Sequence, residues 1–355
     1  MIEKATKRKH MTQLAAYRRE LFRSPKLKFL FLELTQRCNE HCRHCGSRCG
    51  DNVPADTLTK DEIFSFLKKI SEQFDLNTLQ LCITGGEPLL REDFFEIMNY
   101  ANSLGFHWGI TTNGTLIDAQ TAEKLERAGM GTVSVSLDGL RETNDWFRQK
   151  PGGFDLALNG VRELLKRGTF RHVQVTTVVT KKNIGELDEL YKLLSSEKVH
   201  SWRVINIEPI GRAKEQPELL LEPDDYRKMF DFIKEKRFAG DMEVTYGCSH
   251  YLGEELEREV RKWYFLCNAG IYTASVMYNG DIGACLDIER RPELIQGNIR
   301  RDDFKKVWES GFKAFRGDSR KCRGCKHYLF CGGDSFHTWN FDENKPGLCF
   351  KGILF

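Results

Sequence analysis

The strongest constraint on the fold is a regular alternation of short β-rich runs with amphipathic stretches between Lys28 and Phe238. Strands are predicted at 28–35, 79–84, 106–112, 132–137, 172–179 and 202–207, and helices near 59–74, 91–104, 118–128, 155–167, 184–196 and 223–238. Repeated β–α units are typical of a parallel sheet covered by helices. They predict an α/β fold built on a partial (β/α)6 TIM-like barrel, open on one side. In such folds, chemistry gathers at the loops that follow the carboxyl ends of the strands.

The rest of the chain divides into a basic N-terminal segment, 1–27, and a C-terminal region, 239–355, on either side of the core at 28–238. The basic segment predicts a solvated amphipathic helix, and contact with an acidic peptide or a phosphate surface is the alternative. After about Gly240 the alternation stops, and Gly, Cys and short turns dominate. This region buries little apolar surface for its length, so bound metal clusters are expected to stabilise it.

The composition argues against several classes of function. The 355 residues are 40% hydrophobic and 30% charged, with a formal net charge of +3. These values are ordinary for a globular protein and do not indicate nucleic-acid binding. The chain shows neither the apolar segment of a signal peptide nor a run of about 18 apolar residues that would suggest a membrane span. We therefore expect a cytoplasmic protein without a membrane partner.

The chain contains 12 cysteines, which in a reducing compartment indicate metal ligation or redox chemistry in preference to disulfides. Cys38, Cys42 and Cys45 form a CxxxCxxC motif on the loop after the first predicted strand. Three thiolates at this spacing can ligate three corners of an iron–sulfur cube and leave the fourth iron open. Electron-transfer clusters, in contrast, normally have four cysteine ligands.

Two alternatives concern the same loop. A tetrahedral zinc site could combine the cysteines with His41 or His44. Cys49, four residues beyond the motif, could close the cluster as a fourth ligand, but we expect it to be a loop thiol.

A CxxxCxxC motif directly after the first strand resembles the hallmark of the radical S-adenosylmethionine (SAM) superfamily. The resemblance implies that Cys38, Cys42 and Cys45 hold a 4Fe–4S cluster, whose open iron chelates the amino and carboxylate groups of SAM's methionine. The family usually has an aromatic residue just before the third cysteine, near the adenine. His44 stands at that position in this chain.

The ends of the following strands carry further similarity to this family. Gly85, Gly86 and Glu87 lie in a segment that looks like the family's GGEP motif; glycines allow close approach of the backbone to a ligand, and Glu87 would accept a hydrogen bond from SAM's amino group. By resemblance, the remaining cofactor contacts fall to Asn113, Ser136 at the ribose, Asp138 at the floor and Arg148 at the methionine carboxylate. Val178 or Val179 could pack against adenine, but residues of a buried strand are core by default. Turn chemistry is the alternative for the Asn-Gly and Asp-Gly pairs, and a surface salt bridge is the alternative for Arg148.

The C-terminal region resembles the SPASM extension of radical SAM maturases, a twitch-like domain that holds auxiliary iron–sulfur clusters. The resemblance implies one or two auxiliary 4Fe–4S clusters. The first would use Cys267 and Cys285 with Cys248, and the second would use Cys322, Cys325, Cys331 and Cys349. Ser335 stands where the family has a further cysteine, so the first site lacks one thiolate; Asp287, Asp334 or His337 could substitute. A zinc ribbon is the alternative, and the first site could instead keep an open iron or hold no cluster.

The implied activity is that of an oxidoreductase: SAM is cleaved reductively to a 5′-deoxyadenosyl radical, which abstracts hydrogen from a substrate. The auxiliary clusters would then accept an electron, and a low-potential donor of the flavodoxin or ferredoxin type would supply the first one. The expected substrate is a ribosomal peptide or protein that acquires a thioether or carbon–carbon crosslink or an oxidised residue. A small molecule, such as an aminocyclitol or a tetrapyrrole, is the alternative, and a zinc-stapled binding protein without catalysis is a third. Asn206 or Glu208 could act as a base, although loop structure is the expected role of Glu208.

Overall fold

The computed structural model describes residues 3–240, 242–317 and 321–355. Its main sheet has ten strands in the order β10-β9-β8-β1-β2-β3-β4-β5-β6-β7. The strands are β1 (Phe29–Glu33), β2 (Gln80–Thr84), β3 (His107–Thr112), β4 (Met130–Ser136), β5 (His172–Val179), β6 (Ser201–Asn206), β7 (Glu243–Tyr246), β8 (Thr273–Val276), β9 (Asp281–Gly283) and β10 (Gly297–Asn298). A small separate sheet pairs β11 (Trp339–Asn340) with β12 (Lys345–Pro346).

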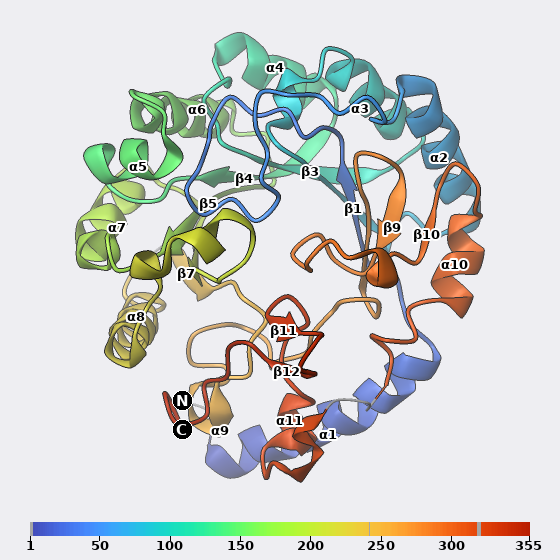
Figure 1. Ribbon diagram of the computed structural model, residues 1–355. Helices are drawn as coiled ribbons and strands as arrows, with labels where there is room; N and C mark the ends of the chain where they lie inside the picture. Colours follow the sequence, from blue (N-terminus) through green and yellow to red (C-terminus); the bar gives the residue numbers. More distant parts are fainter. Residues whose placement is uncertain (1–2, 241, 318–320) are drawn as a thin grey trace.

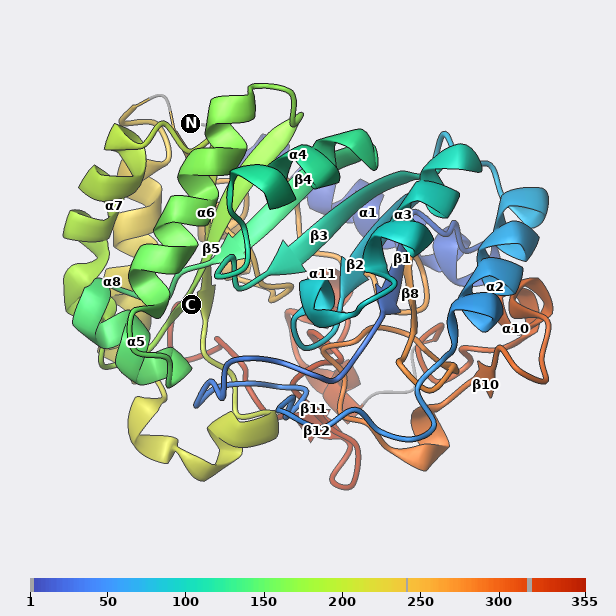
Figure 2. The ribbon, with the colours of Figure 1, turned by 90° about the horizontal axis from the view of Figure 1, so that it is seen from above.

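The helices of the structure include the six predicted between 59 and 238, which lie outside the curved sheet. The helices are α1 (Lys4–Arg23), α2 (Lys60–Gln73), α3 (Phe94–Ser103), α4 (Ala119–Arg127), α5 (Arg141–Arg148), α6 (Gly153–Arg167), α7 (Leu187–Ser196), α8 (Pro223–Lys236), α9 (Gly253–Leu256), α10 (Phe304–Ser310) and α11 (Tyr328–Cys331). Figure 1 shows α2 to α8 around the outside of the arc and the C-terminal region on its open side. From above, α3, α4 and α6 cover strands β3 and β4 (Figure 2). The six predicted strands and the partial barrel are therefore confirmed.

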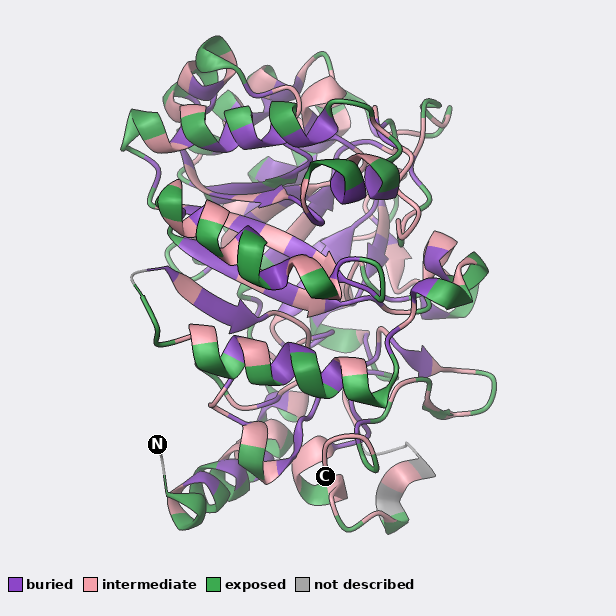
Figure 3. Ribbon diagram, turned by 90° about the vertical axis from the view of Figure 1, so that its left-hand side faces the viewer, coloured by how far each residue is buried: buried purple, intermediate pink, exposed green. Residues whose placement is uncertain are grey.

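Local sequence explains why these elements form. Along β5 the side chains alternate, and Val173, Val175 and Val179 are buried because successive side chains of a strand point to opposite faces. Helix α2 begins at a complete capping box between Thr59 and Glu62, which satisfies two backbone N–H groups at the helix start. Figure 3 shows the result, with exposed outer faces on the helices and buried strands behind them.

The C-terminal region contributes more to the sheet than its sequence suggests. Strand β7 pairs in parallel with β6, and β8 pairs in parallel with β1. Beyond β8, the strands β9 and β10 continue the sheet in antiparallel pairs. Loss of the alternation after Gly240 hid these strands, because they are short and are recruited to sheet edges that would otherwise expose unpaired backbone groups. The boundary between core and tail at 238/239 stays a prediction.

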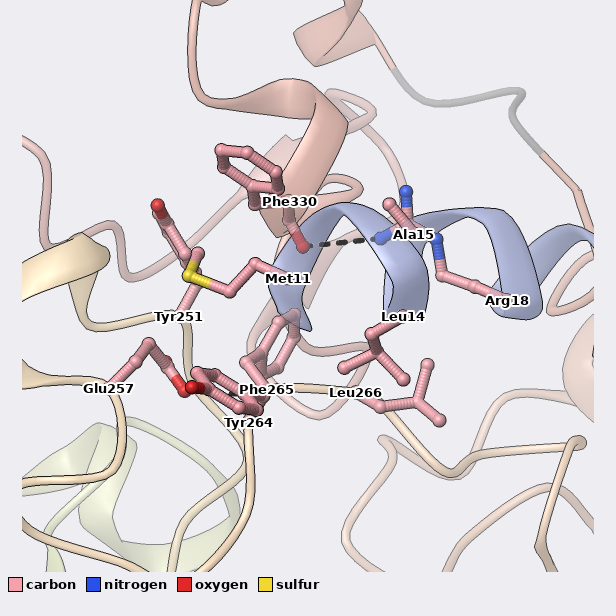
Figure 4. Close-up of a pocket in the computed structure, with 10 residues that line it drawn as sticks. All are labelled: Met11, Leu14, Ala15, Arg18, Tyr251, Glu257, Tyr264, Phe265, Leu266 and Phe330. Carbon is pink, nitrogen blue, oxygen red and sulfur yellow. Dashed lines mark hydrogen bonds between the residues drawn. The ribbon is translucent and has the colours of Figure 1, made fainter. Parts of the chain in front are cut away.

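The basic N-terminal segment forms helix α1, which packs against the tail. Met11, Ala15 and Leu21 are buried, and the Lys7 ammonium donates to the backbone oxygen of Glu255 at 2.9 Å. A small pocket between α1 and the tail is lined by Met11, Leu14, Ala15, Arg18, Tyr251, Glu257, Tyr264, Phe265, Leu266 and Phe330 (Figure 4). The predicted helix is confirmed, but the expectation that it is solvated is wrong for the face that packs against the tail. Throughout the described residues, we find no helix whose length and apolar character would let it cross a membrane.

Candidate active site

The three cysteines of the first motif lie on one loop that follows β1 and is fixed at both ends. The Cys38 backbone N–H donates to the oxygen of Gly50 at 2.7 Å, which closes the base of the loop. Farther along, Arg212 donates from Nε to the oxygen of Cys42 at 2.8 Å and from Nη1 to the oxygen of Cys49 at 3.0 Å. Hydrogen bonds from the backbone and from the Arg212 guanidinium thus fix the conformation of the loop.

The two glycines of the second motif bring the β2 loop against the cysteine loop. The Gly86 N–H donates to the oxygen of Thr35 at 2.7 Å, and the Glu87 N–H donates to the oxygen of Arg37 at 2.8 Å. A Cβ atom on Gly86 would lie 2.1 Å from the Arg37 oxygen, and Gly85 has a φ of +146°, so neither position admits a larger residue without displacement. In this structure, the backbone at Gly85 and Gly86 approaches the cysteine loop closely.

Glu87 is fully buried and ties the loops after β2 and β3 together. Its carboxylate accepts from the Thr112 hydroxyl at 2.9 Å, from the Asn113 N–H at 2.8 Å and from the Leu89 N–H at 3.2 Å. Asn113 in turn donates to Asn39, on the cysteine loop, at 2.7 Å. Burial raises the pKa of Glu87 to about 7, in spite of these hydrogen bonds. The predicted contact of Glu87 with an amino group stays a prediction.

Arg148, at the end of α5, lies between two buried carboxylates beside the cysteine loop. Its Nη1 donates to Glu40 Oε2 at 2.8 Å and lies 3.9 Å from Cys42 Sγ, and its Nη2 donates to Asp138 Oδ2 at 2.6 Å. The three charged side chains are 7%, 1% and 0% exposed, so a surface salt bridge is wrong for Arg148. The two carboxylates hold the guanidinium charged in this buried place and raise its pKa.

The other predicted cofactor residues lie around this ion pair. His44 Nε2 is 3.5 Å from Asp138 Oδ2, and burial lowers the pKa of His44. The Val178 N–H donates to Asp138 Oδ1 at 2.7 Å. Ser136 is the last residue of β4 and is partly exposed at the same edge, whereas Val179 is fully buried core. The structure therefore brings His44, Ser136 and Val178 to the carboxyl edge of the sheet beside the cysteine loop. This edge is called the mouth of the barrel below.

The thiols of the loop differ in character. Burial raises the pKa of Cys38 to about 12 and raises that of Cys42. The pKa of Cys45 is lowered to about 5, first because the neighbouring Cys49 thiol donates a hydrogen bond to it, and also because Arg212 lies nearby. Cys49 is buried against Cys45, and its place as a loop thiol outside the cluster stays a prediction.

The residues at this mouth fit a 4Fe–4S cluster with SAM. Beside the cysteine loop, three buried polar side-chain atoms have no hydrogen-bond partner among the described residues, namely Glu40 Oε1, His44 Nδ1 and Arg148 Nε. Buried polar groups are normally paired, so unpaired atoms beside three free thiols are consistent with a bound polar group. Sequence reasoning missed Glu40 and Arg212; an acidic residue inside the cysteine motif was the available signal for Glu40.

In the tail, the residues of the first auxiliary site come together. Cys285 Sγ lies 3.8 Å from Asp287 Oδ2, and Cys267 Sγ lies 3.8 Å from Ser335 Oγ. Burial raises the pKa of Cys285, with further contributions from Asp287 and Cys267, and burial likewise raises that of Cys248. Of the residues suggested as substitutes for the missing thiolate, Asp287 lies beside the predicted ligand Cys285.

The cysteines of the second auxiliary site also lie near one another. The Cys325 N–H donates to the oxygen of Cys322 at 2.9 Å. Burial raises the pKa of Cys331, with contributions from Asp334 and Cys349, and Cys325 contributes to the raised pKa of Cys349. Asp334 was suggested as a substitute ligand for the first auxiliary site. It lies near Cys331, which belongs to the second site.

The two candidate bases, on β6 and on the loop that follows it, are both hydrogen-bonded to other side chains. Asn206 Oδ1 accepts a hydrogen bond from the Tyr246 hydroxyl at 2.6 Å. Glu208 is bonded to His250 and His337. A role for either as a base stays a prediction.

Fold and site together define a SAM-dependent iron–sulfur enzyme, and comparison with known proteins supports this. The radical SAM superfamily model matches residues 32–194, and the SPASM iron–sulfur cluster-binding domain matches residues 267–326. The AdoMet-dependent heme synthase of Methanosarcina barkeri is 30% identical over 318 residues, which are 85% of this chain and 89% of the relative. The mycofactocin maturase of Mycolicibacterium smegmatis is 30% identical over 311 residues, 85% of this chain and 76% of the relative. The chain belongs to the radical SAM superfamily and carries a SPASM-type domain.

Solved structures have the same fold. The chain aligns with anSMEcpe bound to AdoMet and a Cp18Cys peptide with a TM-score of 0.70 and 22% identity, covering 91% of this chain and 93% of that one. It aligns with Streptococcus suis SuiB bound to SAM with a TM-score of 0.69 and 19% identity, covering 87% and 73%. The cofactors of this family are a 4Fe–4S cluster with SAM and, in the SPASM domain, auxiliary iron–sulfur clusters.

Proposed function

We propose that this protein oxidises its substrate by a reaction that begins with hydrogen abstraction. The observation that carries the proposal is the placement of Arg148 Nη1, which lies 3.9 Å from Cys42 Sγ and bonds to Glu40 in a buried position. A fixed cation beside a three-thiol loop suits a cluster together with a carboxylate ligand. Cys38, Cys42 and Cys45 would hold the cluster, which with SAM supplies a 5′-deoxyadenosyl radical.

The residues around the loop would position SAM and exclude water. Arg148 has its Nε atom unpaired, which leaves a donor for the methionine carboxylate. Glu87 would hold the amino group, and its existing bonds to Thr112 and Asn113 fix the carboxylate in advance. Preorganised groups of this kind orient a ligand at little entropic cost. Ser136 would contact the ribose, and His44 would lie near the adenine.

The tail would supply the electron acceptors that make the overall change an oxidation. Cys248, Cys267 and Cys285 would hold one auxiliary cluster, and Cys322, Cys325, Cys331 and Cys349 would hold another. The second group has four cysteines, the number that an electron-transfer cluster normally uses. A flavodoxin or ferredoxin would supply the electron for SAM cleavage.

A ribosomal peptide or protein is the first candidate substrate. The 30% identity to a mycofactocin maturase, over 85% of this chain, supports it. A tetrapyrrole is the second candidate, favoured by 30% identity to an AdoMet-dependent heme synthase that the alignment covers over 89% of its length. A second relative of this kind from Methanosarcina barkeri, named Fe-coproporphyrin III synthase, is 28% identical.

One experiment separates the two substrate classes. The anaerobically reconstituted enzyme is given SAM, dithionite and either a deuterated peptide encoded beside its gene or iron coproporphyrin III. Transfer of deuterium into 5′-deoxyadenosine and a matching mass change in the peptide support the first class. Consumption of the porphyrin with the peptide unchanged supports the second, and turnover of neither compound would count against both.

A further inference from the structure

A cluster of three buried side chains joins the carboxyl edge of the barrel to the tail. Glu208 follows strand β6, whereas His250 and His337 belong to the tail. Their side chains are 8%, 0% and 11% exposed. Both histidines direct Nε2 at the same carboxylate oxygen, Glu208 Oε1, at 2.7 Å from His250 and 2.8 Å from His337. The three candidate ligand atoms all lie within 4.8 Å of one another.

The other nitrogen of each imidazole is held by a separate partner. His250 Nδ1 lies 2.9 Å from Asp334 Oδ2, and His337 Nδ1 lies 2.5 Å from Ser335 Oγ. Asp334 is itself fixed by the Tyr251 N–H at 2.8 Å. Histidines that ligate a metal almost always have this outer hydrogen bond to a carboxylate or another oxygen, because it sets the tautomer and aims the second nitrogen.

The carboxylates of this cluster are largely shielded from water. The side chains of Glu208 and Asp334 are 8% and 4% exposed. Carboxylates in such places are normally paired with a cation or coordinate a metal. A divalent cation held by both Nε2 atoms and by Glu208 Oε1 would supply such a partner, in place of two hydrogen bonds to one oxygen.

We propose that Glu208, His250 and His337 bind one divalent transition-metal cation of the zinc class, through ligands other than the cluster cysteines, and that His337 therefore does not substitute for the thiolate missing from the first auxiliary site. Two imidazole nitrogens and a carboxylate oxygen form a donor set that zinc accepts in proteins, and three protein ligands leave a coordination position for water or a substrate oxygen. The site lies at the same edge of the sheet as the SAM residues, because Glu208 follows the carboxyl end of β6. It does not depend on the identity of the substrate.

The test uses the reconstituted holoenzyme and added Zn²⁺ as the probe. After removal of loosely bound metal, the expected content is about one zinc per chain, and X-ray absorption at the zinc edge is expected to show only nitrogen and oxygen at about 2.0–2.1 Å. Zinc that had entered a cysteine site would instead show sulfur at about 2.3 Å. A sulfur-only spectrum, or no retained zinc, would overturn the proposal.

Variants assign the ligands. Glu208→Gln and His337→Gln are expected to lose the bound zinc and keep the acid-labile sulfide of the clusters, which also shows that the protein has folded. His172→Gln is the matched control, since this half-buried histidine on β5 bonds to Ser201 and is outside the cluster. The proposal fails if Glu208→Gln retains as much nitrogen- and oxygen-bound zinc as the control.

Discussion

Arg148 donates to Asp138 Oδ2 at 2.6 Å, and this buried bond links the end of helix α5 to the loop after strand β4. Arg148 also bonds to Glu40, which is inside the cysteine motif. The cysteine motif is thereby held against two segments that lie about 100 positions farther along the chain. The groups that would contact the cofactor therefore restrain one another.

Replacement of Arg148 tests this restraint. Arg148→Met leaves two buried carboxylates without their cation, and removal of one partner of a buried ion pair costs about 3–5 kcal/mol. We expect a lower thermal midpoint and loss of SAM binding in calorimetry. Arg171→Met removes an exposed arginine and is the control. SAM affinity in Arg148→Met equal to that of the control would contradict the assigned role.

The glycine at position 86 makes a steric prediction. Gly86→Ala places a Cβ atom 2.1 Å from the backbone oxygen of Arg37, so the cysteine loop has to move. Overpacking of this kind costs about 1–3 kcal/mol, and we expect a lower melting temperature with reduced iron at the first cluster. Gly185→Ala is the control, since no atom lies within 4 Å of the added group. Equal iron content in both variants would show that the loop tolerates the change.

Glu87 makes a prediction about pH. Its pKa in the folded protein is about 7, above the ordinary value of 4.5, so the native state binds more protons than the unfolded state between these values. Stability therefore falls as the pH rises from 4.5 through 7. In Glu87→Gln this part of the pH dependence is expected to vanish, as measured by thermal midpoints of the cluster-loaded protein between about pH 5 and 7. Identical slopes in the two proteins would argue against a neutral buried Glu87.

The second group of tail cysteines is predicted to act after SAM cleavage. Cys325→Ala is expected to retain part of the 5′-deoxyadenosine formation and to lose the oxidised product, because it removes a ligand of an electron acceptor. Cys82→Ala, in strand β2, is the control. If Cys325→Ala abolishes 5′-deoxyadenosine formation as fully as a change in the first motif, the tail serves folding alone.

Sequence patterns were sufficient to predict the barrel, because periods of 2 and 3.6 residues are local properties of strands and helices. The cysteine loop and the glycines at 85 and 86 were recognisable for the same reason, since each is a short contiguous motif. The strand β8 was not recognisable: four residues carry little periodic signal, and pairing with β1 depends on residues about 240 positions away.

Long-range partners within the site also escaped the sequence. Glu40 and Arg148 are separated by 108 positions, and Arg212 bonds to Cys42 across 170. No local pattern marks such pairs, because the fold alone brings them together. The same is true of Glu208, which the sequence suggested as a loop residue and which the fold places between two histidines.

We propose that Cys38, Cys42 and Cys45 alone hold the cluster that cleaves SAM, with Cys49 outside it. The most direct measurement is 5′-deoxyadenosine formation from SAM by anaerobically reconstituted, dithionite-reduced protein. We predict formation by the native protein and by Cys49→Ala, and none by Cys42→Ala. Complete loss in Cys49→Ala, or undiminished formation in Cys42→Ala, would contradict this assignment.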